Sequence, residues 1–375
     1  MTITRRQFIK RLSAGAFIVG ANPLLSACGG ITRNDLISDK LTAENLFDLD
    51  EMDGKILSYA SLAPSALNVQ PWFVRVVNRQ RHWIIGADPR RRLPAIDPDN
   101  REILLSIGAF VENLFIAASA MGLSADFEII AKTPFDPEIV SVKFTKSPKV
   151  DYPLKRLSLR RTVKKGFLQK ELKSQTIDEL SAPIKDHFLY SPKGTAHATC
   201  IRDGLVEQYR NQLQRDAAQA EISSWIRLTD DDAEKYMDGL TLEGMEIGGI
   251  PGWYLRHFAE PPDFMKPGYR KKSLDYIAAL ADEGAGWIVI TSDGNDVSHL
   301  IETGRRFEQM ALKARENNVA IHPMSQYLEE KSGLEMIRMS HEKDIVPQFM
   351  LRVGYRYNYP PPVSLRRSVC WFLRA

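Results

Sequence analysis

The chain is poor in cysteine: its 375 residues include only Cys28, Cys200 and Cys370. They form no Cys-x-x-Cys pair and no His/Cys spacing typical of a metal site. The sequence therefore supplies no disulfide framework and predicts no bound metal. We expect Cys200 and Cys370 to be two buried thiols, and the alternative is that they pair in an oxidising compartment.

An excess of charge of one sign is also missing. Fifty Lys and Arg residues against 47 Asp and Glu give a net charge of +3 at pH 7. A basic surface of the kind that binds nucleic acid needs a larger and more clustered excess. We therefore expect no nucleic-acid partner. No internal repeat is legible at the level of sequence identity.

The N-terminus lacks an apolar run long enough to span a membrane. Residues 4–10, Thr-Arg-Arg-Gln-Phe-Ile-Lys, predict a twin-arginine export signal, and a mildly apolar run rich in Gly and Ala follows over residues 12–25. Such a run is too short for a stable spanning helix, which needs about 20 apolar residues. We predict that residues 1–30 are a targeting segment and that the protein is periplasmic.

The signal ends in Leu-Ser-Ala-Cys-Gly, residues 25–29, which resembles a bacterial lipobox. In that interpretation Cys28 is lipidated and anchors the protein to the membrane. The alternative is simple cleavage nearby with Cys28 incidental.

Hydrophobic periodicity divides the rest into a linker at 31–50 and two units, 51–150 and 151–375. In the first unit it predicts a helix at 52–59, strands at 73–77 and 82–87, a helix at 101–121, and strands near 127–130 and 139–144. The helix at 101–121 is apolar nearly all round and should be buried. In the second unit it predicts helices near 195–220 and 296–318 and strands at 287–291 and 348–353.

Residues 225–268 show little periodicity but contain Trp225, Trp253 and Tyr254. Long segments without regular structure are usually functional or disordered. The aromatic side chains favour an ordered lid.

The run at 64–72, Pro-Ser-Ala-Leu-Asn-Val-Gln-Pro-Trp, joins a turn to a predicted strand. The amides of Asn68 and Gln70 each offer a donor and an acceptor, which suits the pyrimidine edge of a flavin. The alternative is a polar turn that caps the strand.

A second run, Ser-Leu-Arg-Arg-Thr-Val-Lys-Lys-Gly-Phe at 158–167, concentrates positive charge. Arginine forks bind phosphate with two parallel hydrogen bonds, and the hydroxyl of Thr162 adds a donor. The alternative is a solvated basic turn, which is the favoured interpretation of Arg-Arg-Thr taken alone.

The first run resembles the FMN-binding signature of the nitroreductase superfamily, and Arg160-Arg161-Thr162 resembles its phosphate-binding pattern. In ordinary nitroreductases the phosphate pattern precedes the turn, and the two come from different subunits of a homodimer. Here it follows the turn, an order similar to that of Acg-type FMN-binding oxidoreductases, in which two nitroreductase-like halves are fused. Runs at 88–94, 97–99, 322–326 and 347–355 agree with that branch, and the resemblance covers about residues 51–370.

The resemblance implies a role for each matching residue. The turn should face the flavin and its ribityl chain through Pro64, Ser65, Asn68 and Gln70. The phosphate should be bound by Arg160, Arg161 and Thr162 of the basic run and by the C-terminal Arg366 and Arg367. Lys164 should lie near flavin N1 and O2, and the loop of Pro323, Met324 and Ser325 should offer backbone N–H toward N5. The alternatives are a helix-terminating turn for the loop and a basic tail for Arg366 and Arg367.

The resemblance also implies an α+β nitroreductase fold, two halves in one chain, binding one FMN. The expected function is an FMN-dependent oxidoreductase that reduces a quinone- or nitro-like small-molecule acceptor, with the chemistry carried by flavin N5 rather than by a catalytic side chain. The alternative is a protein that stores FMN under its lid without turnover. A fused dimer of this kind should be a monomer.

Overall fold

The structure is a computed structural model that describes residues 30, 49–78, 81–340 and 345–374. The predicted export signal, Cys28 and nearly all of the predicted linker lie outside these residues. Export and lipidation therefore stay predictions from the sequence.

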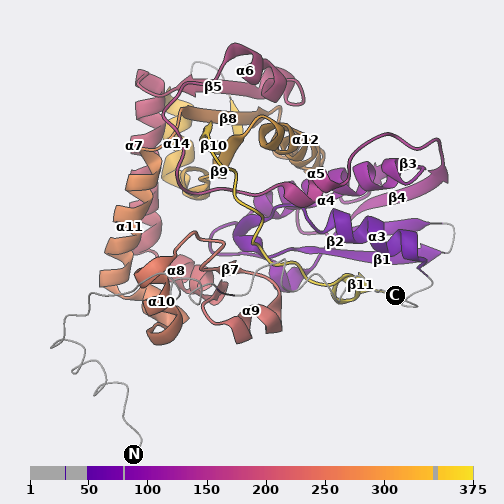
Figure 1. The fold of residues 1–375 in the computed structure, drawn as a ribbon, viewed down its shortest axis with the longest axis horizontal. Helices are drawn as coiled ribbons and strands as arrows, with labels where there is room; N and C mark the ends of the chain where they lie inside the picture. Colours follow the sequence, from indigo (N-terminus) through magenta and orange to yellow (C-terminus); the bar gives the residue numbers. More distant parts are fainter. Residues whose placement is uncertain (1–29, 31–48, 79–80, 341–344, 375) are drawn as a thin grey trace, which may run out of the picture.

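The first sheet has the strand order β11-β1-β2-β4-β3. Its strands are β1 (Trp72–Asn78), β2 (His82–Ala87), β3 (Leu123–Ile129), β4 (Glu138–Lys146) and β11 (Leu373–Arg374). All neighbours are antiparallel except β11, which pairs parallel with β1. The C-terminal segment (yellow) leaves the second sheet and crosses to the first to form this edge (Figure 1).

The second sheet has the order β5-β8-β10-β9 and is entirely antiparallel. It consists of β5 (Phe188–Pro192), β8 (Gly286–Ser292), β9 (Val319–Pro323) and β10 (Val346–Tyr355). Without β11, both sheets follow the same order, in which the first strand is followed by the second, fourth and third. The predicted strands are confirmed, whereas β5, β9 and β11 were not predicted.

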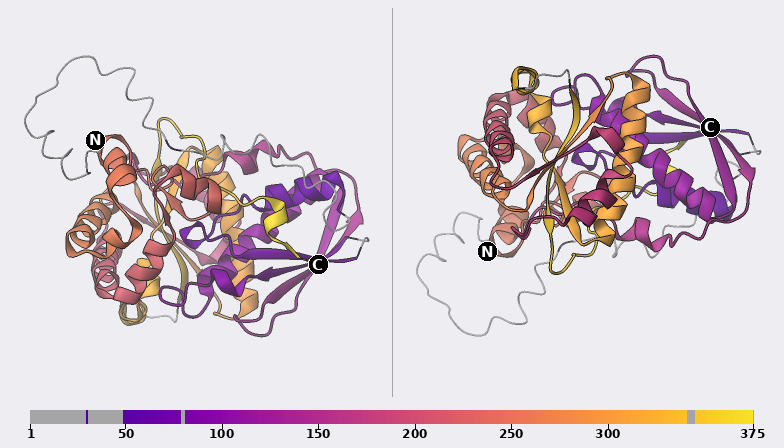
Figure 2. Two further views of the ribbon diagram at one scale, coloured as in Figure 1. Left: turned by 90° about the horizontal axis from the view of Figure 1, so that it is seen from below. Right: turned by 90° about the horizontal axis from the view of Figure 1, so that it is seen from above.

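In each sheet a 20-residue helix follows the second strand: α4 (Arg101–Ala120) and α12 (Val297–Glu316). The two helices pack against each other, between the sheets (Figure 2). Among the described residues, α4 is the one helix long and apolar enough to cross a membrane, but most of it is buried inside the protein. The predicted burial of this helix is confirmed, and Gly122, with φ of +87°, follows its C-terminal end.

The contact between α4 and α12 depends on Gly108 and Gly304. A Cβ added to Gly108 would collide with the carbonyl oxygen of Ile301, and a Cβ added to Gly304 would collide with that of Leu105. Each glycine is the eighth residue of its helix, and each carbonyl belongs to the fifth. The contact is therefore reciprocal, with equivalent positions on both sides.

Residues 193–285, between β5 and β8, form a long insertion that packs outside the second sheet and beside the first half (Figure 1). It contains α7 (Ala196–Gln214), α8 (Asp216–Ser224), β6 (Ile226–Arg227), α9 (Asp230–Tyr236), β7 (Leu240–Thr241), α10 (Gly249–Phe258), η5 (Pro261–Met265) and α11 (Pro267–Ala281). The expectation that residues 225–268 lack regular structure was wrong, because short helices such as α9 give too few turns for a clear period.

The remaining elements are short. They are α3 (Glu51–Ala60), η2 (Ala66–Asn68), η3 (Pro89–Arg91), α5 (Lys155–Leu159), α6 (Ser174–Ser181), η4 (Lys185–His187), α13 (Gln326–Glu329), α14 (Lys331–Ser340) and η6 (Val369–Trp371). The expectation of two buried thiols was also wrong. Cys200 on α7 and Cys370 in η6 are exposed and free, because both elements turn these positions outward.

The glycine contact predicts the effect of adding a methyl group. Gly108→Ala and Gly304→Ala should each lower the free energy of unfolding by about 1–3 kcal/mol, because the helices must separate to admit the new Cβ. Gly268→Ala is the control, since an added Cβ there has nothing within 4 Å. Chemical denaturation measures all three, and equal stability of the three variants would contradict the tight contact.

Candidate functional site

The turn before β1 has an unusual backbone. Leu67, Asn68 and Gln70 have φ values of 45°, 55° and 50°, in the left-handed region that residues other than glycine seldom adopt. The hydroxyl oxygen of Ser65 accepts a hydrogen bond from the Gln70 N–H at 2.9 Å and closes the turn. Strain of this kind persists only where the surroundings enforce it, and it concentrates at functional sites.

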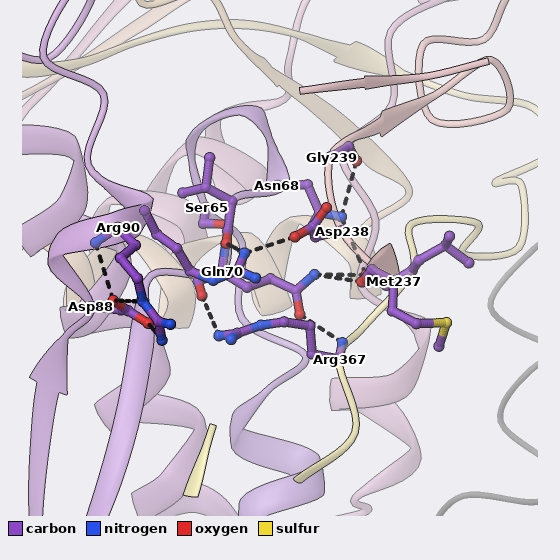
Figure 3. Close-up of polar contacts among 12 residues, drawn as sticks. Ser65, Asn68, Gln70, Asp88, Arg90, Met237, Asp238, Gly239 and Arg367 are labelled. Carbon is purple, nitrogen blue, oxygen red and sulfur yellow. Dashed lines mark hydrogen bonds and ion pairs between the residues drawn. The ribbon is translucent and has the colours of Figure 1, made fainter. Parts of the chain in front are cut away.

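The side-chain amide of Asn68 is bound by two distant segments (Figure 3). Its Nδ2 donates to the carbonyl oxygens of Gly239, at 3.1 Å, and Leu365, at 3.2 Å, and its Oδ1 accepts from Arg366 at 3.0 Å. The N–H of Gly239 donates to the backbone oxygen of Asn68 at 3.1 Å. Asn68 therefore links the turn to the insertion and to the C-terminal segment.

Gln70 is fully buried, and both ends of its amide have partners within the protein. Its Nε2 donates to the Met237 carbonyl at 2.8 Å, and its Oε1 accepts from the N–H of Arg367 at 2.8 Å (Figure 3). The side chain of Arg367 in turn donates to the carbonyl oxygens of Gln70 and Trp72. The donor–acceptor pair that the sequence indicated is thus used by the chain itself, and Arg367 lies against the turn.

The basic segment at 160–164 comes from the start of the second half. Val163 N–H donates to the Ile321 carbonyl at the edge strand β9, at 3.3 Å, which fixes the segment beside the second sheet. Arg160 is buried, and it donates to the carbonyl of Leu62 at 2.9 Å. The basic segment thereby contacts Leu62, two residues before the turn that begins at Pro64, although the two segments are far apart in sequence.

Arg366 reaches the same carbonyl group. It donates to Leu62 and Ala63, both at 3.1 Å. Arg160 also pairs with the carboxylate of Glu308 on α12 at 3.0 Å. Burial raises the pKa of Glu308 to about 7, although the charges of Arg160 and Arg366 oppose this. Arg366 therefore lies close to the basic segment, as predicted. The side chain of Arg367 instead contacts the carbonyl oxygens of Gln70 and Trp72.

The other polar residues of the basic segment, Arg161, Thr162 and Lys164, are partly buried. Arg161 pairs with Glu246 of the insertion at 2.7 Å. Burial lowers the pKa of Lys164 to about 8; Glu246 opposes the shift and Arg161 adds to it. The negative charge near Lys164 is therefore too small to offset its burial.

The sequence did not predict two neighbours of Lys164, the cation Arg352 and the titratable His322. Arg352 in β10 is fully buried, and it donates to the Lys164 carbonyl at 2.6 Å and approaches Nδ1 of His322 at 3.3 Å. Burial, with the charges of Arg352 and Lys164, lowers the pKa of His322 well below its ordinary value. A single arginine inside the apolar strand 348–353 was the signal that could have identified this position.

The loop after β9 lies deeper than expected. Met324 is buried, and its N–H donates to the Met350 carbonyl at 2.9 Å, so this N–H belongs to the sheet. Pro323 and Ser325 are partly exposed. Ser325 Oγ donates to Glu329 at 2.6 Å.

Next to this loop lies a carboxyl group that the sequence did not indicate. Glu102, at the start of α4, is buried, and burial followed by the nearby charge of Glu329 raises its pKa to about 8. Arg101 contacts it at 3.0 Å. A carboxyl group that stays protonated at neutral pH can donate a proton.

No protein-family model matches the chain. Over 318 residues it is 24% identical to “Putative NAD(P)H nitroreductase Rv3131” of Mycobacterium tuberculosis, which covers 80% of this chain and 84% of the relative. It is 25% identical over 320 residues to “Putative NAD(P)H nitroreductase acg” of the same organism, covering 83% and 91%. “Probable NAD(P)H nitroreductase PigM” of Serratia is 22% identical over 320 residues, covering 80% and 86%.

These similarities over most of the chain support an assignment to the nitroreductase superfamily, as an Acg-type member. The resemblance inferred from the two sequence motifs is thereby confirmed. The mixed helix and strand content is compatible with a nitroreductase-like fold. The names of the relatives support a nitroreductase-type oxidoreductase.

The contacts of Arg366 predict its contribution to the stability of the protein. Arg366→Met should lower the free energy of unfolding by about 3 kcal/mol, because it removes the donor to the buried oxygens of Asn68 and Ala63 and leaves Glu308 with one cation fewer, while Arg160 still donates to Leu62. Arg306→Met is the control, since Arg306 pairs with Glu302 on the surface of α12. Urea denaturation at pH 7 measures both, and a loss no larger than that of the control would contradict the structural role of Arg366.

Proposed function

We propose that the protein is an FMN-dependent oxidoreductase of the nitroreductase type, which passes electrons from a donor through FMN to a quinone- or nitro-like acceptor. The observation that carries the proposal is the contact between Arg160 and the Leu62 carbonyl. It brings together the two motifs whose resemblance implied a flavin site, the turn at 64–72 and the basic segment at 160–164. FMN, when bound, supplies the transfer of electrons at N5.

We also propose that the two halves are a fused dimer with one FMN site, and that the protein is a monomer. Three features support this: the shared strand order of the sheets, the equal length of α4 and α12, and the reciprocal contact of Gly108 and Gly304. Equivalent positions contact each other across the two-fold axis of a homodimer. A fused dimer would retain that contact within one chain.

The residues of the basic segment fit a phosphate group. Arg161 and Lys164, with Arg352 of β10, bring three positive charges together, against the carboxylates of Glu246 and Glu283. Among the described residues, the buried Nε atoms of Arg161 and Arg352 have no hydrogen-bond partner. Burial lowers the pKa of Lys164 to about 8, and a phosphate bound beside it would favour its charged form. In the proposed reaction, these cations hold the phosphate, the turn orients the flavin, and Glu102 holds a proton near Ser325.

The proposal predicts how FMN binding depends on pH. The phosphate interacts favourably with the charged form of Lys164, and this form is lost as the pH rises through about 8. FMN affinity should therefore fall between pH 7.5 and 9.5, with about one FMN per chain at saturation. Quenching of FMN fluorescence measures both quantities. Lys164→Met should weaken binding at pH 7.5 and flatten the pH profile.

Lys170→Met is the control for this experiment, because Lys170 is exposed and lies outside the basic segment, six positions after Lys164. It should keep the pH profile of the unmodified protein. An unchanged profile in Lys164→Met would mean that another group binds the phosphate, and a protein that takes up no FMN would overturn the proposed function.

The insertion spans the two parts of the proposed site. Gly239 contacts Asn68 in the turn, and Glu246 pairs with Arg161 in the basic segment at 2.7 Å. We propose that residues 237–246 form the lid. The carboxylate of Glu246 is bound to the same guanidinium group that the proposed phosphate needs, so lid closure and FMN binding interact through Arg161.

Glu246→Gln tests the lid and the enzymatic function together. It removes a charge that competes for Arg161, so FMN should bind about tenfold more tightly, which corresponds to about 1.4 kcal/mol. The variant should also speed reoxidation of the reduced flavin by a small quinone under anaerobic conditions. Stopped-flow absorbance measures this rate.

Glu243→Gln is the matched control, because Glu243 lies in the same segment and pairs with Arg256 at 2.5 Å. It should leave FMN affinity unchanged. Weaker FMN binding in Glu246→Gln would mean that Glu246 supports the site. Failure of quinones and nitroaromatics to reoxidise the flavin in the unmodified protein would indicate storage of FMN without turnover.

A further inference from the structure

A recess of about 500 Å³ lies beside Asp238, and no residue of the basic segment lines it. One wall is the loop that carries Arg90, Arg91 and Arg92 after β2. The other wall comes from the insertion, between α8 and the end of α9, and includes Trp225 and Arg227. None of these residues belongs to the proposed FMN site.

The recess has an excess of positive charge. Four arginines line it, and the acidic side chains among its lining residues are Glu221 and Asp238. Asp238 is buried and is shared by two of the arginines, with Arg91 at 2.7 Å and Arg227 at 2.8 Å. The carboxylate of Glu221 is occupied by the backbone N–H groups of Ala95 and Ile96, at 3.1 Å and 3.0 Å.

Two of these arginines, Arg91 and Arg227, lie over aromatic rings. The guanidinium carbon of Arg91 lies 5.7 Å from the Trp225 ring, and that of Arg227 lies 5.5 Å from Trp225 and 4.6 Å from Tyr236. The N–H groups of Arg227 already donate to Asp238 and to the carbonyl oxygens of Ser224 and Ile226, and Nη1 of Arg91 donates to Asp238 and Val69. These two guanidinium groups therefore form a fixed cationic wall. A phosphate would take its hydrogen bonds from Arg90 and from N–H groups that it draws away from Asp238.

Arg90 stands at the mouth of this array. Its side chain is 84% exposed, and its partner Asp88 is shared with Arg374 at 2.9 Å (Figure 3). An arginine whose counter-ion is already divided keeps net positive charge for a ligand. The recess therefore combines fixed cations inside with an exposed one at its rim.

We propose that this recess binds an organic phosphate of nucleotide size. The excess of arginines calls for an anion, and the volume lies within the range of small-molecule pockets, well above that of a lone phosphate. Asp238 lies between Met237 and Gly239, which contact Gln70 and Asn68. A ligand that draws Arg91 away from Asp238 would thus act on the same turn that forms the proposed flavin site.

The test uses FMN-saturated protein in 150 mM salt, with inorganic pyrophosphate and ADP as probes and adenosine as the neutral comparison. Calorimetry should give saturable binding of one pyrophosphate or ADP per chain and none of adenosine. Arg90→Ala should weaken ADP binding about tenfold or more, since a charge-assisted hydrogen bond is lost. Arg202→Ala is the control, because Arg202 pairs with Asp203 and Asp282 elsewhere on the surface.

Three results would overturn the proposal: no saturable binding of either phosphate probe, equal losses in Arg90→Ala and Arg202→Ala, or release of FMN by pyrophosphate, which would assign the binding to the flavin site. The proposal does not rest on FMN. If the protein takes up no flavin, the proposed function fails, while the same titration of the flavin-free protein still tests the recess.

Discussion

The close contact of α4 with α12 is the constraint on which the arrangement of the site depends. The absence of side chains at Gly108 and Gly304 lets the two backbones touch. This sets the distance and angle between the two sheets, because each helix packs on its own sheet. Only with the sheets in this relation can Arg160, which opens the second half, reach the carbonyl of Leu62 before the turn of the first.

Around this contact the protein buries charged groups, and the partners of each group influence its protonation state. Glu308 lies between Arg160 and Arg366 and is completely buried. The removal of a buried charge's partner usually costs more than the pair contributes by itself. The network at Leu62 therefore contributes more to the choice of one arrangement of the two halves than to total stability.

The insertion links regions that would otherwise act separately. Its residues 237–246 contact the turn through Gly239, the basic segment through Glu246 and the arginine-lined recess through Asp238. A single short segment thus contacts both the proposed flavin site and the arginine-lined recess. Any ligand that changes the position of this segment changes the surroundings of Asn68 and Arg161 together.

The groups with displaced pKa values have different environments. Burial holds Lys164 near pKa 8 among cations, whereas Glu102 is raised to about 8 by burial and by Glu329. The first environment favours an incoming anion and the second holds a proton on a carboxyl group. Neither property follows from the residue type, since both depend on what other segments bring close.

The sequence by itself determined most of the local structure. The periodicity predicted β1, β2, the buried helix α4 and strands β8 and β10, because each is a strongly patterned apolar segment. The runs around Asn68 and Arg160 identified the family, because their spacing is specific. It did not determine what Gln70 binds, the joining of β11 to β1, the exposure of Cys200 or the stack of Arg91 on Trp225. These were decided by the tertiary structure, since each depends on contact between segments far apart in sequence, and such contacts depend on how the sheets and helices pack rather than on local propensity.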